Sequence, residues 1–312
     1  MTRAAVIAVV SVCAALAVGW RRPATPPAPA PLNVCSSRPG TAIERSYAVA
    51  GRIRLLFFWT SGREVGSARI NWTGAPDGAC GLELLIGTDP DRAPGRLNRW
   101  GYVAETTRGG TTSLLGVMTQ SDEQTIERAK DSMSAAAQGA GYSYRAIRAT
   151  IADGYSNTEV VRLLESQELT YRDLDRLLAR LPPPGELRRT PMPPNADSGF
   201  LSSVATVLHE TVTAVGETRR IRTPVRRQFV HAGQPYDLTL RQADVRDSLT
   251  LGSATYHDVI EGEFDVRSRA TRETTTFEIV YGTRGALAEV PLQIRYHPRW
   301  WLALELTLKE RR

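Results

Sequence analysis

A loop between two predicted strands, residues 87–102, combines side chains suited to binding an anionic or sugar-like ligand. Arginine guanidinium groups form paired hydrogen bonds with carboxylates or phosphates, and an indole ring stacks on a sugar ring or a cation. The composition also has a structural interpretation, because Asp-Pro and Pro-Gly form turns across which arginine and aspartate can pair. If the loop binds a ligand, we expect the contacts to come from Arg92, Arg96, Asn98, Arg99, Trp100 and Tyr102.

Three carboxylates in or near this loop are candidates for acid–base chemistry. Asp89 and Asp91 lie two residues apart, and Glu105 lies in the strand that follows. Two carboxyl groups about 5–10 Å apart across a groove can hydrolyse a glycosidic bond. A hydrolase of envelope polysaccharide is therefore an alternative function, and it requires these carboxyls to line an open groove beside Trp100 and Tyr102.

The sequence lacks the local motifs of metal binding, nucleophilic catalysis and phosphate binding. Its four histidines form no His-x-x-x-His pair, and no Cys-x-x-Cys pair is present. The Gly-x-Ser-x-Gly turn of serine hydrolases and a glycine-rich loop followed by lysine are missing too. We therefore predict no metal and no cofactor, and we favour a non-enzymatic protein.

The densest positive segment spans residues 219–227, in a chain of net charge +6. Of its 39 basic residues, only Lys130 and Lys309 are lysines, and arginines occur along the whole chain. In an exported protein, a basic patch fits anionic lipid headgroups, lipopolysaccharide phosphates or acidic polysaccharide, whereas export disfavours nucleic acid. A solvated hairpin tip is the structural alternative. The patch consists of Arg219, Arg220, Arg222, Arg226 and Arg227.

The first 20 residues have the pattern of an export signal. Arg3 precedes an apolar run that ends at Trp20, and Ala15-Leu16-Ala17 provides small residues for signal peptidase. The run is also close to membrane-spanning length, so an uncleaved anchor is the alternative. Residues 21–40 are rich in proline and alanine and predict an extended spacer. We expect a periplasmic or envelope protein, either cleaved and soluble or anchored through residues 1–20.

The cysteine content predicts a disulfide bond. Cleavage of the signal would remove Cys13 and leave Cys35 and Cys80. Two thiols in an oxidising compartment usually pair. We therefore predict a bond between Cys35 and Cys80, with two free buried thiols as the alternative.

Short runs of β-favouring residues separated by turn residues predict a mainly β (α+β) fold. We expect a curved antiparallel sheet, a half-barrel or a sandwich, with a small helical insert. Pro291 cannot donate a ladder hydrogen bond, so its strand should lie at an edge or carry a bulge. The predicted strands are Tyr47–Trp59, Val65–Trp72, Cys80–Ile86, Arg99–Glu105, Ser113–Thr119, Thr274–Tyr281, 290–296 and 302–308.

Helical periodicity predicts the insert at residues 121–181. Capping-box patterns begin at Ser121, Ser156 and Thr170, and the last two predict a helical hairpin with one apolar side. That side should pack on the sheet, or, if exposed, on another envelope protein, which is a second alternative function. A proline-rich linker, 182–199, then separates the β region 41–181 from a second β region, 200–312.

The segment Gly62–Ile70, together with the strand-rich tail that ends at Trp300-Trp301, resembles a group of exported bacterial antiparallel β proteins of unknown function. The resemblance implies a curved sheet or half-barrel in which a turn at Val65-Gly66 joins the first two strands. It implies no catalytic residues, and the helical insert departs from its pattern.

These observations favour a non-enzymatic ligand-binding or envelope-maintenance module. A curved sheet without a recognisable catalytic constellation can hold an apolar or amphipathic ligand on its concave face, or an anionic one at its arginines. The polysaccharide hydrolase and the structural partner of another envelope protein remain as alternatives.

Overall fold

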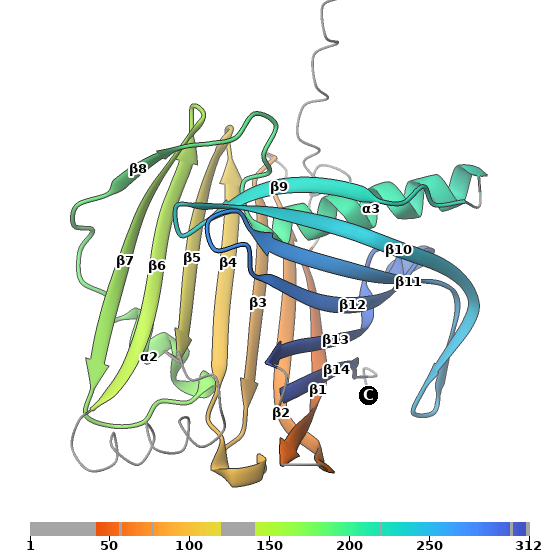
Figure 1. The fold of residues 1–312 in the computed structure, drawn as a ribbon, viewed down its shortest axis with the longest axis horizontal. Helices are drawn as coiled ribbons and strands as arrows, with labels where there is room; N and C mark the ends of the chain where they lie inside the picture. Colours follow the sequence, from red (N-terminus) through yellow and green to blue (C-terminus); the bar gives the residue numbers. More distant parts are fainter. Residues whose placement is uncertain are drawn as a thin grey trace, which may run out of the picture. The chain divides into compact units, whose positions relative to one another are not determined.

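The computed structural model describes residues 42–55, 58–75, 78–119, 141–218, 220–299 and 302–309. Within these residues, 14 strands form one open antiparallel sheet, in the order β8-β7-β6-β5-β4-β3-β2-β1-β14-β13-β12-β11-β10-β9 (Figure 1). Strands that are neighbours along the chain therefore pair, except β8 and β9, which form the two edges, and β1 pairs with β14 to join the two halves. This architecture confirms the predicted mainly β, antiparallel fold.

The first half of the sheet is a meander that ends at the edge strand β8. Its strands are β1 (Ala42–Leu55), β2 (Phe58–Gly74), β3 (Cys80–Thr88), β4 (Trp100–Arg108), β5 (Thr111–Thr119), β6 (Tyr142–Ala152), β7 (Tyr155–Glu165) and β8 (Arg188–Pro191).

The second half begins at the other edge strand and returns to β1. Its strands are β9 (Val225–His231), β10 (Gln234–Leu251), β11 (Ala254–Ser268), β12 (Thr274–Gly282), β13 (Pro291–Arg299) and β14 (Leu302–Leu308). Short helical segments interrupt the loops: η2 (Pro94–Arg96), η4 (Tyr171–Asp173), α2 (Leu174–Leu178) and η5 (Gly285–Leu287).

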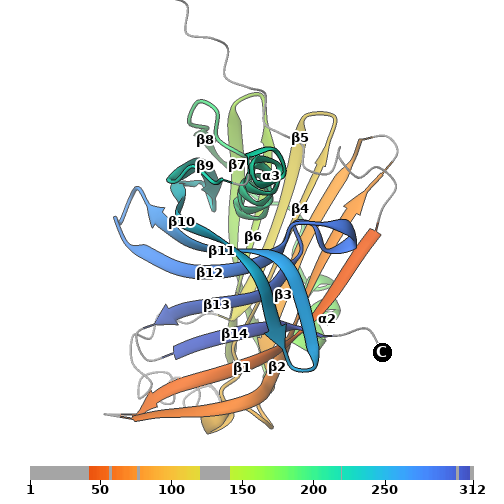
Figure 2. The same cartoon turned by 90° about the vertical axis from the view of Figure 1, so that its right-hand side faces the viewer.

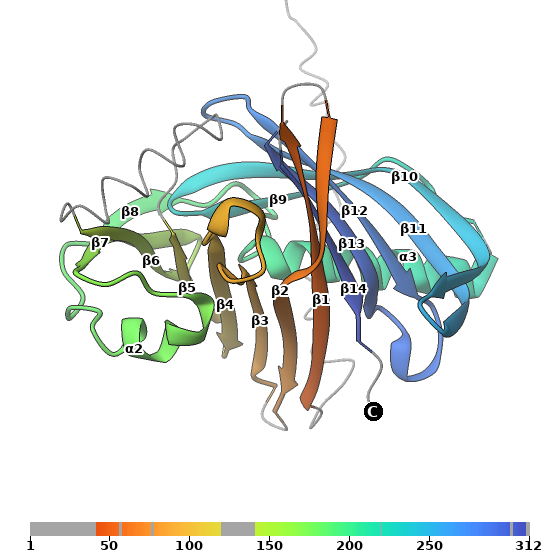
Figure 3. The ribbon, with the colours of Figure 1, turned by 90° about the horizontal axis from the view of Figure 1, so that it is seen from below.

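The long helix α3 (Phe200–Thr218) connects the two edge strands. It contacts β9, β10 and β3 and lies on the concave side of the curled sheet (Figure 3). Across the part of the chain that the structure describes, no helix combines the length and apolarity needed to cross a membrane.

The sheet curls until its second half crosses the first (Figure 2). The β9–β10 hairpin turn reaches the inner face of the first half: a Cβ built on Gly116 would lie 3.9 Å from His231 Cε1, and one on Gly233 would lie 3.7 Å from Thr158 Cβ. Burial of His231 lowers its pKa to about 4. The contact leaves β8 and β9 unpaired with each other, so the sheet is curled but not closed.

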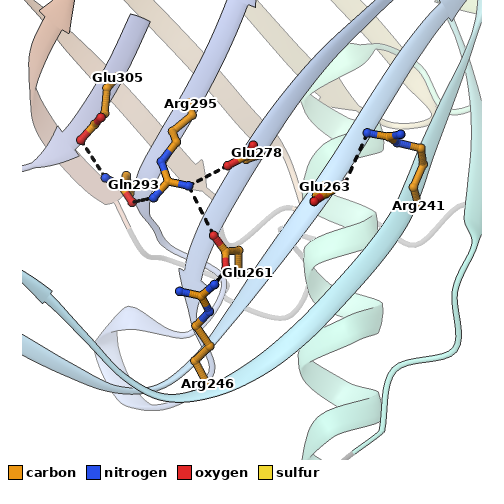
Figure 4. Close-up of polar contacts among 8 residues, drawn as sticks. All are labelled: Arg241, Arg246, Glu261, Glu263, Glu278, Gln293, Arg295 and Glu305. Atoms are coloured by element: carbon orange, nitrogen blue, oxygen red, sulfur yellow. Dashed lines mark hydrogen bonds and ion pairs between the residues drawn. The ribbon is translucent and has the colours of Figure 1, made fainter.

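The outer faces of the two halves differ in chemistry. Over β3–β7 the outer face is apolar and is covered by the segment from Leu169 to Leu181, including α2. Over β10–β14 it carries a polar network centred on Arg295 (Figure 4), with α3 behind the sheet. Glu263 and Glu278 face each other across β11 and β12, and arginines offset the repulsion between them, because Arg241 contacts the first and Arg295 the second.

The predicted helical hairpin is wrong in its first helix. Residues 156–164 belong to strand β7, which pairs with β6 along its whole length. β-Branched residues such as Thr158, Val160 and Val161 favour this state once a partner strand is adjacent. The predicted helix that begins at Ser121 lies outside the described residues.

The capping box at Thr170 is confirmed. The Thr170 N–H donates to Asp173 Oδ2 at 2.9 Å, and the Arg172 N–H donates to Thr170 Oγ1 at 3.3 Å. In the helix that follows, Leu174 and Leu177 are buried on the outer face of the sheet. The predicted apolar stripe is therefore not exposed on α2, whereas Val160 and Leu164 of β7, in the same predicted span, are exposed. A structural partner stays a prediction.

Two further expectations are corrected, and a third is confirmed in one of its two alternatives. Part of the predicted linker is strand β8, which pairs with β7. The predicted turn at Val65-Gly66 lies inside β2, where Gly66 pairs with both β1 and β3. The strand that begins at Pro291 is internal, and a register shift opposite Pro291 supplies the bulge that was the other expectation.

Candidate functional site

A cavity of about 390 Å³ lies between the inner face of the sheet and the first half of α3. Its walls come from three places in the sequence: β2 and β3, β11 to β14, and α3. Most of the lining side chains are aliphatic or aromatic, namely Ile70, Trp72, Leu82, Leu84, Ile86, Phe200, Leu201, Val204, Ala205, Leu208, Val266, Phe277, Ile279, Ile294, Tyr296 and Leu306.

Strand register gathers these side chains on one face. Trp72 pairs with Leu82 across β2 and β3, and the alternation of side chains keeps the residues two positions away on the same side. Ile294 lies between Ile279 and Leu306 in the second half of the sheet. Because the sheet curls, these two apolar stripes face the same enclosed space, which α3 covers.

The start of α3 is held by a buried carboxylate of β4. Glu105 is 2% exposed, and its two oxygens accept hydrogen bonds from the N–H groups of Leu201 at 2.7 Å and Ser202 at 2.8 Å. Burial raises the pKa of Glu105, while these two N–H groups act in the opposite direction. The N-terminal turn of a helix needs such acceptors, so Glu105 positions the helix segment that covers the cavity.

Other contacts hold α3 further along its length. Thr211 Oγ1 lies 2.7 Å from the hydroxyl of Tyr281 on β12, and both residues are buried. Glu210 forms an ion pair with Arg227 of β9. Burial raises the pKa of Asp197, just before the helix, and the charge of Arg227 opposes that rise.

One polar pair lies at the cavity wall. Glu289 lines the cavity, and its Oε1 is 2.8 Å from Nδ1 of His209 on α3. Glu289 has a backbone φ of 62°, in the left-handed region that non-glycine residues seldom adopt. Its N–H donates to the carbonyl of Gly282 at 2.8 Å, which holds the carboxylate in this place.

The predicted ligand loop contacts Leu169, in the segment that precedes η4 and α2. Trp100 Nε1 and Asn98 Nδ2 donate to the Leu169 carbonyl at 2.9 and 3.0 Å, and both residues are buried. Tyr102 packs in the same outer cluster, and burial, with Glu83 nearby, raises its pKa to about 12. These side chains have structural partners within the protein.

The three arginines of the same loop also contact protein groups. Arg92 lies within 4.0 Å of Glu64 and Asp89, Arg96 lies 3.9 Å from Asp91, and Arg99 donates to the Asn98 carbonyl. Arg92 and Arg96 remain largely exposed. Anion binding by this loop stays a prediction.

The predicted carboxylates do not share a groove. Glu105 points to the inner face, opposite to Trp100 and Tyr102 on the same strand, because side chains alternate. Asp89 accepts a hydrogen bond from Arg172 at 2.6 Å. Desolvation opposes ionisation of Asp89, yet the Asp91 N–H and the Arg172 guanidinium hold its pKa below the ordinary value. The arrangement required for the hydrolase alternative is therefore not formed.

The remaining predicted sites are partly outside the described residues. Arg219 and Cys35 lie outside the described residues, whereas Cys80 is described and is buried at the start of β3. Arg220, Arg222 and Arg226 are exposed, so an anionic surface contact stays a prediction, as does the disulfide. The described part of the chain holds no cluster of three or more metal-ligating side chains.

The cavity residues of α3 were missed by the sequence analysis, which predicted only β structure after residue 200. A signal was present: apolar residues at 201, 204, 205, 208, 212 and 215 repeat at helical spacing.

Topology alone places the chain in the class of mainly β proteins with one open, curled antiparallel sheet. No protein-family model and no curated protein matches the sequence. Among solved structures, the chain is similar to a beta-barrel-like protein of domain of unknown function DUF1849 from Brucella abortus. That likeness has a TM-score of 0.45 and 7% identity, and it covers 86% of this chain and 95% of the other.

Proposed function

We propose that this protein is a non-enzymatic binding module that holds an apolar or amphipathic molecule between α3 and the curled sheet. The observation that carries the proposal is the cavity of about 390 Å³, with aliphatic and aromatic walls from both halves of the sheet and from α3. Pockets for small ligands typically have volumes of about 300–1,000 Å³ and are mostly apolar with a few polar groups.

The lining supports a hydrocarbon chain as the bound part. Each methylene moved from water into such a site contributes about 0.8 kcal/mol, so a medium-length chain supplies ample binding energy. Water is a poor occupant, because an ordered internal water needs two to four polar partners and these walls offer few. A single-chain amphiphile is therefore the ligand class that we propose.

A cavity-filling variant tests the proposal. Val204 of α3 lines the cavity, so Val204→Phe should occupy part of its volume. We expect the uncharged fluorophore N-phenylnaphthylamine to bind the unmodified protein with enhanced emission, and Val204→Phe to weaken that binding by at least about ten-fold. Thr213→Phe, at an exposed position of the same helix, is the matched control and should bind normally. Equal binding by both variants would exclude the cavity as the site.

We also propose, from residues 1–40, that the module acts in the cell envelope. The support is the apolar run followed by the Pro/Ala-rich spacer. Fractionation of expressing bacteria, with the intact mass of the recovered chain, tests this proposal. A soluble periplasmic chain lacking about 17 residues indicates cleavage, a full-length membrane-bound chain indicates anchoring, and cytoplasmic recovery contradicts export.

A further inference from the structure

We infer that His209 and Glu289 bind the polar head of the ligand in the cavity, and that this head is an uncharged hydroxyl or amide group rather than an anion. The inference rests on the proposed function, because it assigns one end of the same ligand.

The pair lies where the cavity wall changes from apolar to polar. Glu289 lines the cavity, and its carboxylate is 2.8 Å from His209 Nδ1. Among the other polar residues of the wall, Asn71 and Glu83 pair with each other at 3.1 Å, and strand alternation directs them away from the face of Ile70. Thr275 also lines the cavity, but its hydroxyl group is not ionisable. A ligand with its chain among the apolar side chains therefore meets an ionisable group at Glu289, and His209 contacts that group from α3.

The two side chains are partly accessible to solvent rather than fully buried. The exposed fraction of the side chain is 27% for His209 and 17% for Glu289. A polar head placed beside them would keep some contact with water while its chain remains buried. This is the arrangement that an amphiphile requires, because burying a polar head without partners is costly.

The backbone at Glu289 holds this residue beside the cavity. At φ 62° a glycine or asparagine would fit with less strain, so the backbone conformation does not explain the presence of glutamate. Seven other described non-glycine residues share this positive φ, so the conformation by itself does not mark a ligand site. Here the hydrogen bond to Gly282 holds the residue, and its carboxylate is placed at the cavity.

The chemistry of the His209–Glu289 pair determines which polar head group can bind beside it. A carboxylate in a partly desolvated site repels a second anion, and the repulsion is stronger than in water because the local dielectric is lower. A hydroxyl or amide can donate a hydrogen bond to a carboxylate and accept one from a protonated ring nitrogen. A fatty alcohol or a monoacylglycerol therefore fits this end of the cavity, and a fatty acid anion does not.

Two ligands with the same chain test the inference. Dodecanol and dodecanoate should each displace N-phenylnaphthylamine from the full chain at neutral pH, and we expect dodecanol to bind at least about five-fold more tightly. In Glu289→Gln that preference should shrink by about five-fold or more, since the negative charge is removed. Glu217→Gln is the matched control, because Glu217 is an exposed residue of α3 outside the cavity lining and should leave the preference unchanged.

The outcomes separate the inference from the proposed function. If the fluorophore binds and Val204→Phe blocks it, but Glu289→Gln keeps the preference for dodecanol, the head site is wrong and the cavity proposal stands. A lower melting temperature with an unchanged preference would show that the pair only joins α3 to the loop before β13, and would likewise overturn the inference. If the fluorophore fails to bind the unmodified protein, both proposals fall.

Discussion

Glu105 of β4 and Gly199, the residue before α3, are in such close contact that a larger residue cannot replace the glycine without displacing the carboxylate. A Cβ built on Gly199 would lie 2.4 Å from Glu105 Cδ. This approach lets the carboxylate reach the N–H groups of Leu201 and Ser202. A strand of the first half of the sheet thus determines where the helix over the cavity begins.

Replacing Gly199 by alanine should release the start of α3. The added Cβ moves Glu105 away from two N–H donors, and hydrogen bonds to a charged group contribute about 1.5–3 kcal/mol. We expect Gly199→Ala to lower the free energy of unfolding by about 2 kcal/mol, measured by urea denaturation, and to weaken fluorophore binding. Gly216→Ala is the control: Gly216 lies in the same helix with open space around it, so this change should stabilise the protein by about 0.5–1 kcal/mol. Equal effects of the two changes would contradict the role of the Glu105 contact.

The raised pKa of Glu105 predicts a pH dependence of stability. Because burial raises the pKa of Glu105 above its ordinary value of 4.5, the folded state binds the proton more tightly than the unfolded state. The stabilising contribution is complete below pH 4.5 and is lost as the pH rises through the folded pKa. The free energy of unfolding of the unmodified protein, relative to Glu105→Gln, should therefore increase as the pH falls from neutral towards 4.5. Urea denaturation over that pH range measures it, and a difference independent of pH would contradict the assignment.

Trp100 should contribute to stability without contributing to binding in the cavity. Trp100→Phe removes the hydrogen bond to the Leu169 carbonyl on the outer face, where Asn98 still donates to the same oxygen. We expect a loss of about 1 kcal/mol in the free energy of unfolding and unchanged fluorophore affinity. A large loss of affinity with little loss of stability would instead favour the predicted ligand loop.

Arg295 should stabilise the outer face of the second half of the sheet in a salt-dependent way. Its guanidinium group donates to Glu278 at 2.7 Å and Gln293 at 3.0 Å, and it lies 3.4 Å from Glu261 (Figure 4). The side chain is 38% exposed, so Arg295→Met should cost only about 1 kcal/mol at low salt. Denaturation at low and high ionic strength checks this, and a cost that does not shrink with salt would point to packing as its cause.

Cys35 and Cys80 should resist alkylation until they are reduced. A Cys35–Cys80 bond closes a loop of about 45 residues and contributes roughly 4 kcal/mol in the chain-entropy model. Intact mass after treatment with iodoacetamide, with and without reductant, measures the pairing. Labelling of both thiols without reductant would contradict it.

Residues 302–308 fit one periodicity, whereas residues 156–164 fit two, and only the first segment was predicted correctly. Leu302, Leu304, Leu306 and Leu308 alternate with smaller or polar residues, a pattern that fits only a strand, and β14 was predicted correctly. Residues 156–164 also fit helical spacing, and the pairing of β7 with β6 decides between the two states. A local sequence pattern therefore predicts the secondary structure correctly only where its apolar residues fit one periodicity, that of a helix or that of a strand, and not both.

Sequence by itself determined the antiparallel β class and the capping box at Thr170, because strand alternation and helix capping act over a few neighbouring residues. It also singled out Asn98 and Trp100, but not their role against Leu169. Only the tertiary structure decided which apolar face is enclosed, that Glu105 holds α3, and that His209 meets Glu289. These contacts join residues far apart in the chain, so they exist only after β1 pairs with β14 and the sheet curls around the helix.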